Sequence, residues 1–160
     1  MSYRIGLGTD FHQLTAGRKL WLGGIEIPHS KGAFGHSDAD TLLHAVCDAL
    51  LGALNLGDIG THFPDTDKGL KDIDSKILLE KTYKLISQKG FRIVNLDTVV
   101  CLEKPKIMAY APEMREVISR ILEISVADIS IKATTTEKLG FIGREEGVMA
   151  QAVVLLRKVD

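Results

Sequence analysis

The sequence predicts an α+β fold in which three helices cover one face of a mixed or antiparallel sheet. Three segments repeat apolar residues at helical spacing, and strand-like segments lie between and around them. The last strand-like segment, residues 147–159, is apolar on both faces, whereas a strand with one face in water should alternate with polar residues. Because three helices can cover only one face, we expect a partner subunit to cover the other. Burial of that face by the chain's own loops is the alternative, which the length of the chain disfavours.

Length and charge exclude several classes of protein. The 160 residues are predicted to form a single domain, residues 1–160, large enough for a core without metal or disulfide staples. A formal charge of -1 offers no basic excess for a nucleic acid or an anionic membrane, so an anionic substrate needs a local group of residues.

Apolar stretches stay short of the ~20 residues that span a bilayer, and a signal peptide is not recognisable. Cys47 and Cys101 lie in apolar runs, which favours free thiols in a reducing compartment. We therefore expect a soluble, cytoplasmic protein.

The strands are predicted from short apolar runs bounded by turn or charged residues: 5–12, 19–28, 91–103, 129–133 and 147–159. Gly23 and Gly24 are typical of a two-residue hairpin turn within the second run. Lys-Pro-Lys at 104–106 ends the third. Residues 29–38 and 55–69 are expected to be loops without elements of their own, and a loop as long as the second is usually functional or mobile.

The helices are predicted where apolar residues recur every three or four positions between capping residues: 38–54, 75–89 and 112–123. Ser37 is the expected N-cap of the first helix, with Asp40 three residues on as an acidic variant of the capping box. Asp74 should cap the second helix and Gly90 should end it. Pro112 suits the first turn of the third.

Asp10 and His12 form half of a candidate metal site. Residues two apart in an extended segment point to the same side, so a carboxylate and an imidazole emerge together. Taken alone, the pair reads more readily as a surface acid and a hydrogen-bonded histidine. With His44 the set becomes two imidazoles and one carboxylate, which leaves one position of a tetrahedral zinc open, as a catalytic site requires. Ferrous iron, with more open positions, also fits these ligand types.

His44 lies in an otherwise apolar helix, where a histidine is more often a hydrogen-bonded core residue than a ligand. Asp40 and Asp48 lie four residues on either side, so one of them could orient the imidazole. Asp40 could equally complement the helix dipole. His36 is not expected to share a metal with His44, because eight helical residues span about 12 Å.

Two polar segments could bind phosphates and hydroxyl groups. Thr134–Thr136 follow a strand and offer hydroxyl and backbone N–H groups, Glu137 suits Mg²⁺, and Arg144 offers a bidentate fork for an anion. A polar turn with solvated charges explains this segment equally well. The segment Gly57–Asp67 places carboxylates on a glycine-rich loop, where they can accept hydrogen bonds from a polyol or form Asx turns.

Together these segments resemble one family closely, the 2-C-methyl-D-erythritol 2,4-cyclodiphosphate synthases of the non-mevalonate isoprenoid route, and the similarity runs essentially end to end. The matching motifs are Gly8-Thr-Asp-Phe-His12, His36-Ser-Asp-Ala-Asp40 with His44, Gly57-Asp-Ile-Gly60 with Phe63-Pro-Asp-Thr-Asp67, and Lys132-Ala-Thr-Thr-Thr-Glu-Lys-Leu-Gly-Phe141 with Gly143-Arg144. Each motif is modest support, but their order and spacing together are highly specific.

The resemblance implies a homotrimer with active sites between neighbouring subunits, one Zn²⁺ per subunit on Asp10, His12 and His44, and Mg²⁺ or Mn²⁺ on Glu137 with the substrate diphosphate. It implies that His36 and Thr135 stabilise the transition state. The substrate-binding residues that it implies in one subunit are Asp10, His12, His36 and Ser37 near the phosphates and Asp58, Ile59, Gly60, Phe63, Asp65 and Asp67 around the erythritol. Those that it implies from the neighbouring subunit are Leu102, Pro105, Lys106, Ile107 and Met108 around the cytidine and Thr134, Thr135, Thr136 and Glu137 on the phosphates. Phe141 and Arg144 complete the anion-binding wall.

The reaction that the resemblance implies converts 4-diphosphocytidyl-2-C-methyl-D-erythritol 2-phosphate to the cyclodiphosphate and CMP. The residue chemistry agrees with it, because a phosphate nucleophile needs no serine, cysteine or strong base, only charge neutralisation and alignment. A zinc hydrolase is a rival function, but the sequence offers no obvious general base. A non-catalytic trimer that binds nucleotides is another, but a structural zinc needs a fourth ligand. Phe141 and Arg144 also motivate an isoprenoid diphosphate site on the trimer axis.

Overall fold

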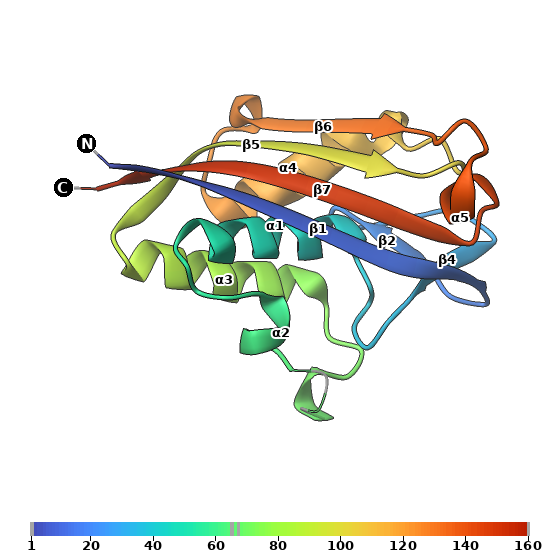
Figure 1. The fold of residues 1–160 in the computed structure, drawn as a ribbon, viewed down its shortest axis with the longest axis horizontal. Helices are drawn as coiled ribbons and strands as arrows, with labels where there is room; N and C mark the ends of the chain where they lie inside the picture. The colour runs from blue at the N-terminus through green and yellow to red at the C-terminus, as the bar shows by residue number, and fades with distance from the viewer. Residues whose placement is uncertain (1, 65, 67, 160) are drawn as a thin grey trace.

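The computed structural model describes residues 2–64, 66 and 68–159, which form a sheet layer and a helix layer (Figure 1). The strands are β1 (Tyr3–Ala16), β2 (Leu20–Leu22), β3 (Ile25–Ile27), β4 (Lys31–Phe34), β5 (Phe91–Cys101), β6 (Ile129–Thr134) and β7 (Gly147–Lys158). The helices are α1 (Thr41–Ala53), α2 (Ile59–His62), α3 (Ser75–Gln88), α4 (Ala111–Leu122) and α5 (Gly140–Gly143), with short 3-10 helices at 68–70, 108–110 and 126–128.

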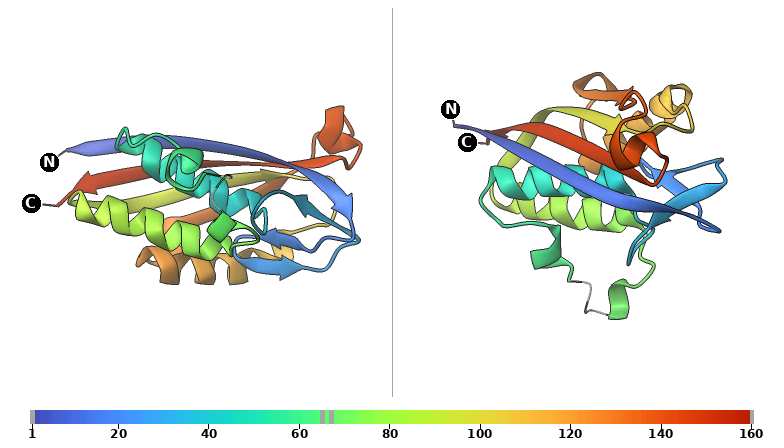
Figure 2. Two further views of the ribbon diagram at one scale, coloured as in Figure 1. Left: turned by 90° about the horizontal axis from the view of Figure 1, so that it is seen from below. Right: turned by 45° about the vertical axis from the view of Figure 1, so that its right-hand side comes forward.

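In the part of the chain that the structure describes, the strands form a five-stranded sheet in the order β4-β1-β7-β5-β6 and a separate β2-β3 hairpin. The pairs are antiparallel except β5 with β6, which run parallel and are joined by a crossover through α4. Helices α1, α3 and α4 lie on one side of the sheet (Figures 1 and 2), with α1 against β1 and β7 and α4 against β6. The predicted α+β class with a mixed sheet is therefore confirmed.

Two glycines let α1 lie directly on the backbone of β1. A Cβ atom on Gly6 would stand 1.8 Å from the carbonyl oxygen of Ala49, and one on Gly8 would stand 1.9 Å from that of Ala45. No side chain larger than hydrogen fits between strand and helix at these positions. This close approach fixes the height of α1 above the strand, and with it the position of His44.

The opposite face of the sheet is apolar and exposed. Ile5 and Leu7 of β1 are 72% and 63% exposed, and Val153 of β7 is 43% exposed. By contrast, the helix-facing positions of β7, such as Ala150 and Val154, are buried. The structure thus confirms that the three long helices cover one face only. What covers the other face stays a prediction.

Several local signals are confirmed. Gly23 and Gly24 both adopt positive φ, 62° and 81°, as the turn of the β2-β3 hairpin requires. Asp74 caps α3 by accepting a hydrogen bond from the backbone of Lys76, and Gly90 follows the helix with φ 75°. A proline also stands in the first turn of α4.

The predicted start of α1 is wrong. The helix begins at Thr41 and its N-cap is Asp40, whose Oδ1 accepts from the backbone N–H of Leu43 at 3.0 Å. The same carboxylate accepts from the N–H groups of Gly23 (3.0 Å) and Gly24 (2.7 Å) in the hairpin turn. A carboxylate satisfying three backbone donors in the core outcompetes the Ser37 hydroxyl as the cap. Burial raises the pKa of Asp40 to about 6, although these N–H groups act in the opposite direction.

Both predicted loops contain regular structure. Residues 29–38 include the edge strand β4, which pairs with the second half of a β1 that extends to Ala16, beyond the predicted end at residue 12. Residues 55–69 include α2 and the start of a 3-10 helix. The helix α5 was also unforeseen, in the segment that follows the threonines.

No helix among the described residues is long and apolar enough to cross a membrane. Cys47 is a buried free thiol, as predicted, whereas the free thiol of Cys101 is only half-buried.

Candidate active site

Asp10, His12 and His44 converge at one point between β1 and α1. Asp10 Oδ2 lies 3.0 Å from His12 Nε2 and 3.3 Å from His44 Nδ1, and the two ring nitrogens are 3.2 Å apart. Asp10 and His12 continue the helix-facing side of β1 on which Gly6 and Gly8 lie, and α1 supplies His44 from above. One ligand atom from each residue therefore faces the same small volume, as the spacing predicted.

The donor set fits a divalent metal ion. Asp10 Oδ2 is buried and makes no hydrogen bond of acceptable geometry to any described residue. His12 Nδ1 lies 2.9 Å from the carbonyl oxygen of Phe34, which can only accept, so the ring proton sits on Nδ1 and the lone pair of Nε2 points at Asp10 and His44. Two imidazoles and one carboxylate leave a coordination position open for substrate or water.

The close approach of these side chains shifts the pKa values of Asp10 and His12. Burial by itself raises the pKa of Asp10, but the adjacent imidazoles outweigh it and lower the pKa to about 2. Burial by itself lowers the pKa of His12, but the Asp10 carboxylate reverses this and raises the pKa above its usual value. The site thus attracts positive charge, whether a proton or a metal ion.

A pocket of about 280 Å³ opens onto the three ligands. Its walls are formed by β1, the loop before α1, α2 and the start of α3: Asp10, His12, Gly35, His36, Ser37, His44, Ile59, Gly60, Phe63, Leu70, Ile73 and Leu78. His36 Nε2 is buried there without a hydrogen-bond partner among the described residues, so it is available to a ligand. His36 does not belong to the metal cluster, as predicted, but it precedes α1 rather than lying in it.

The prediction that Asp40 or Asp48 orients the His44 imidazole is wrong. Asp40 is engaged with backbone N–H groups, and Asp48 accepts from the backbone N–H of Ile59 at 2.7 Å. Burial raises the pKa of Asp48. His44 Nε2 instead contacts the hydroxyl groups of Ser75 (2.9 Å) and Ser37 (3.2 Å). Ser75 was missed because it comes from another helix, 31 residues away in the chain.

The loop predicted to bind the erythritol lies partly in this pocket. Ile59, Gly60 and Phe63 line it, whereas Asp58 is exposed and caps α2 by accepting from the N–H and hydroxyl of Thr61 at 2.8 and 2.7 Å. These hydrogen bonds lower the pKa of Asp58. The predicted residues Asp65 and Asp67 lie outside the described residues.

A second pocket, of about 180 Å³, collects the residues predicted to surround the cytidine. It is lined by Leu102, Pro105, Lys106, Ile107, Met108, Ala133, Thr134 and Thr135. Two segments that are far apart in the sequence thus form one surface, because β5 and β6 are paired in parallel and end side by side.

Glu103 organises the threonine loop beside this pocket. Its Oε1 accepts from the backbone N–H groups of Thr136 and Lys138, both at 3.1 Å. Thr135 Oγ1 in turn donates to Glu137 Oε1 at 3.1 Å, so the hydroxyl and the carboxylate predicted to act on phosphate and metal are adjacent. Glu137 and Lys138 both adopt left-handed backbone, with φ of 52° and 65°. Sequence patterns gave no sign of Glu103, whose partners lie more than 30 residues away.

Arg144 already has a partner. Its Nε and one terminal nitrogen donate to the two carboxylate oxygens of Glu146 at 3.1 and 3.0 Å, and both side chains are exposed. Phe141 packs beside Phe11, with ring centroids 6.1 Å apart. An anion at Arg144 would therefore compete with Glu146.

The two pockets do not meet within one chain. They share no lining residue, and Asp10, Ala150, Val100 and Ala133 stand in register across β1, β7, β5 and β6. Three strand spacings of about 4.8 Å put the metal ligands roughly 14 Å from the start of the threonine loop. His36 and Thr135, predicted to act on one substrate, thus lie in different pockets of the same chain.

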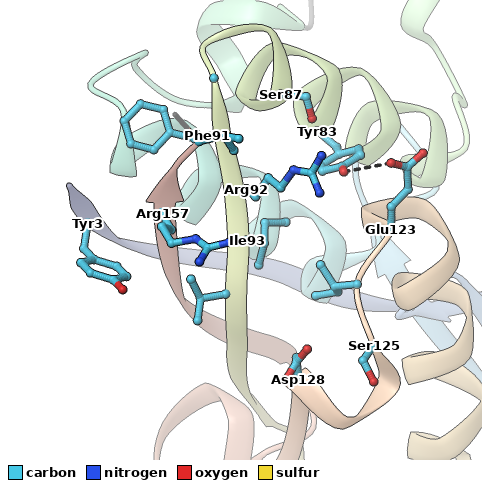
Figure 3. A pocket seen from close by; sticks show the side chains of 14 residues that line it. Tyr3, Tyr83, Ser87, Phe91, Arg92, Ile93, Glu123, Ser125, Asp128 and Arg157 are labelled. Atoms are coloured by element: carbon cyan, nitrogen blue, oxygen red, sulfur yellow. Dashed lines mark hydrogen bonds between the residues drawn. The ribbon is translucent and has the colours of Figure 1, made fainter. Parts of the chain in front are cut away.

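A larger pocket, of about 890 Å³, lies at the other end of the sheet near the chain termini (Figure 3). Arg92 and Arg157 stand opposite each other on β5 and β7, and Tyr83 donates to Glu123 at 3.1 Å. None of the residues singled out by the sequence as functional lines it, so its size alone does not make it the active site.

The fold and the cluster of Asp10, His12 and His44 define an α+β protein with a candidate metal site, and comparison with known proteins identifies the family. The YgbB family model matches residues 3–157, and the chain belongs to this family. A 2-C-methyl-D-erythritol 2,4-cyclodiphosphate synthase of Bacteroides thetaiotaomicron is 61% identical over 158 residues, 99% of each chain. One of Shouchella clausii is 56% identical over 157 residues, 98% of this chain and 99% of its own. The resemblance inferred from the four motifs is thereby confirmed.

Solved structures of related proteins share the whole fold. A bifunctional IspDF from Campylobacter jejuni has a TM-score of 0.95 and 40% identity, covering 99% of this chain, which spans 43% of the length of that protein. A 2C-methyl-D-erythritol-2,4-cyclodiphosphate synthase in its CDP-bound form has a TM-score of 0.89 and 38% identity over 96% of this chain and all of its own. A Plasmodium falciparum IspF in complex with CDP has a TM-score of 0.88 and 35% identity, covering 99% of this chain and 98% of its own.

Proposed function

We propose that this protein converts 4-diphosphocytidyl-2-C-methyl-D-erythritol 2-phosphate to 2-C-methyl-D-erythritol 2,4-cyclodiphosphate and CMP. An oxygen of the 2-phosphate forms a bond to the phosphorus that carries the erythritol. The bond from that phosphorus to the oxygen bridging the two phosphates breaks, and its electron pair leaves with CMP. Water is not consumed, so the site needs alignment and charge neutralisation rather than a hydrolytic base.

One observation carries this proposal: Asp10, His12 and His44 open into a pocket beside His36, whose buried Nε2 has no hydrogen-bond partner among the described residues, in a chain that matches a named synthase over 99% of its length. Zinc bound by these ligands would supply a positive charge that stabilises the pentavalent transition state. Mg²⁺ or Mn²⁺ held by Glu137 would neutralise the diphosphate. His36 hydrogen-bonds a phosphate oxygen through Nε2, and the Thr135 hydroxyl does so from the other pocket.

The remaining pocket residues position the two ends of the substrate. Asp58, Ile59, Gly60 and Phe63, with Asp65 and Asp67, bind the erythritol, and Ser37 contacts the phosphate. Leu102, Pro105, Lys106, Ile107 and Met108 enclose the cytidine, while Thr134, Thr136 and Glu137 bind its phosphates. The cytidine assignment is supported by the shared pocket of these residues and by the CDP bound in two related structures.

The active site is assembled between subunits of a homotrimer. Two observations support this: the metal and cytidine pockets are separated within one chain, and an apolar sheet face containing Ile5, Leu7 and Val153 is exposed. A ring of three chains can place the cytidine pocket of one against the metal pocket of the next. The free thiols of Cys47 and Cys101 support a reducing, cytoplasmic location.

An isoprenoid diphosphate binds on the trimer axis, where Phe141 offers apolar contact and Arg144 charge. Its diphosphate must displace Glu146 from Arg144. Isothermal titration with an isoprenoid diphosphate should therefore show binding that Arg144→Ala removes, and an unchanged affinity would contradict this site.

Product analysis by mass spectrometry tests the reaction. Purified protein with Zn²⁺ and Mg²⁺ should form CMP and the cyclodiphosphate in equal amounts. His44→Ala should lose both bound zinc and product formation, whereas His29→Ala, which removes a half-buried histidine outside both pockets, should retain them. A wild-type protein that binds zinc and substrate but forms neither product would refute the enzyme assignment and favour a binding role.

Mixing two inactive variants tests the shared site. His44→Ala damages the metal pocket and Thr135→Ala the threonine loop, so neither forms product alone. In randomly mixed trimers about one quarter of the interfaces combine two intact halves, and activity should return to roughly that fraction of the wild-type value. If each chain holds a complete site, mixing restores nothing.

A further inference from the structure

A chain of three polar groups leads from the metal ligand His44 to a carboxylate outside the pocket. His44 Nε2 lies 2.9 Å from Ser75 Oγ, and Ser75 Oγ lies 2.5 Å from Asp38 Oδ1. Ser75 is fully buried and His44 is 9% exposed, so water cannot readily replace either hydrogen bond. Asp38 lies in the loop before α1, and Ser75 is the first residue of α3.

The direction of these hydrogen bonds follows from what each group can donate. An ionised carboxylate only accepts, so the single hydroxyl proton of Ser75 points to Asp38. The oxygen of Ser75 is then left to accept from His44, which places the ring proton of His44 on Nε2. Ser37 Oγ, the other contact of Nε2 at 3.2 Å, accepts from the backbone N–H of Ala39 at 3.0 Å and keeps a second lone pair that can share the His44 proton.

We infer that Asp38 and Ser75 are positioning residues that hold His44 in the tautomer presenting a bare Nδ1 to the metal. This inference deepens the proposed function, since it concerns the same metal site. A neutral imidazole carries one ring proton, and a proton on Nδ1 would have to be lost before a metal could bind there. The Phe34 carbonyl accepts the Nδ1 proton of His12 in the same way. The two ring nitrogens that face Asp10, His12 Nε2 and His44 Nδ1, are then free of protons in the neutral rings.

Further hydrogen bonds hold this chain of His44, Ser75 and Asp38, called the relay below, in place. Asp38 Oδ2 accepts from the backbone N–H of Ser75 at 3.0 Å, and the backbone N–H of Asp38 donates to the carbonyl of Ile73 at 3.1 Å. Asp38 is thus clamped to the start of α3 by its side chain and its backbone. A purely structural role would be to join the α1 and α3 termini, and the test must separate that role from control of the tautomer.

Ser75→Ala removes the nearer acceptor of the His44 proton and leaves Ser37 Oγ at 3.2 Å. We expect the zinc dissociation constant, measured by competition with a chromophoric chelator, to rise about tenfold to hundredfold. In the metal-free protein, the ring ¹⁵N shifts of His44 should change from a single Nε2–H form to a mixture of tautomers. Ser119→Ala is the matched control, because it removes a helical serine hydroxyl that donates to the Ile124 carbonyl at 2.6 Å on α4. It should leave zinc affinity and the His44 shifts unchanged.

Asp38→Asn should reverse the direction of the hydrogen bonds from residue 38 through Ser75 to His44. It provides a second test if Ser75→Ala does not fold. The amide must keep its oxygen toward the backbone N–H of Ser75, which cannot rotate, so its NH₂ group faces the hydroxyl. The hydroxyl then turns and donates to His44 Nε2, which shifts the ring proton to Nδ1. The ¹⁵N shifts should show that inversion, with weaker zinc binding.

The possible results separate this inference from the proposed function. Unchanged ¹⁵N shifts and zinc affinity in Ser75→Ala and Asp38→Asn would overturn the relay while leaving the synthase assignment intact. An equal loss of zinc affinity in Ser119→Ala would also overturn it, because the effect would then be general destabilisation. A wild type that binds no zinc would refute the metal in the proposed function, and the ¹⁵N shifts would still decide the tautomer.

Discussion

Replacing Gly8 by alanine tests whether α1 must lie directly on β1 to keep the metal ligands together. The new Cβ would stand 1.9 Å from the carbonyl oxygen of Ala45 and 2.6 Å from the backbone N of Ala49. Both neighbours are backbone atoms, so no side chain can rotate away, and strand and helix must separate by more than 1 Å. His44 precedes Ala45, and metal–ligand distances tolerate only about 0.2 Å. The ligand set should therefore lose its geometry.

The expected effect is a loss of both stability and metal affinity. Overpacking of this kind costs about 1–3 kcal/mol, and a backbone clash belongs at the upper end, so the melting temperature should fall by roughly 10 °C. We expect zinc to raise the melting temperature of the wild type and to have no such effect on Gly8→Ala. The assay is thermal unfolding at one fixed protein concentration, with and without Zn²⁺, together with chelator competition.

Gly52→Ala is the matched control on the same helix. A Cβ at Gly52 meets nothing closer than the carbonyl oxygen of Leu7 at 3.9 Å, an ordinary contact. Because alanine is the better helix former, this variant should be stabilised by about 0.5–1 kcal/mol with unchanged zinc affinity. A Gly8→Ala protein with the melting temperature and zinc affinity of the wild type would refute the argument that this contact positions His44.

Two further predictions concern other parts of the site. In the metal-free protein, Asp10 has a folded pKa of about 2 against 3.8 unfolded, so its ionised form contributes stability above pH 4 that is lost as the pH falls toward 2. The loss should be about 2 kcal/mol by urea unfolding, and Asp10→Asn should flatten this dependence; an equally steep curve in the variant would contradict it. Glu103→Ala should raise KM about tenfold with little change in melting temperature, because it frees the N–H groups of Thr136 and Lys138, whereas Glu103→Gln retains an acceptor and should lie closer to the wild type. A wild-type KM in Glu103→Ala would show that the loop needs no such support.

The features that the sequence predicted well are those set by local periodicity. Asp10 and His12 share a side of β1 because side chains alternate along a strand. Helix α3 lies between its N-cap Asp74 and Gly90 because capping depends on nearby backbone. The candidate metal triad could be proposed because Asp10 and His12 emerge on one side of a strand and, with His44, complete the ligand types of an open zinc site. The other candidate site residues came from the resemblance, and their roles stay predictions.

The features that the sequence did not predict depend on contacts between distant segments. Ser37 and Asp40 are both good N-cap residues, and the choice of Asp40 is decided by hydrogen bonds to Gly23 and Gly24, which local spacing cannot show. The edge strand β4 exists because β1 is long enough to pair with it, although its own sequence is short and contains glycine. Ser75 reaches the metal site in the same way, through packing of α3 against α1.

The two pockets are proposed to bind opposite ends of one substrate, which is why we expect catalysis to depend on assembly. The metal ligands stand on a strand and a helix whose spacing is set by glycine contacts, so their geometry is fixed within one chain. The threonine loop is held by Glu103 at the end of β5, about three strands away. Attack of one substrate phosphate on another gains rate chiefly from holding both ends in line. Neither pocket alone can do so, and the exposed apolar face of Ile5 and Leu7 supports the proposed assembly, in which a neighbouring chain would supply the second pocket.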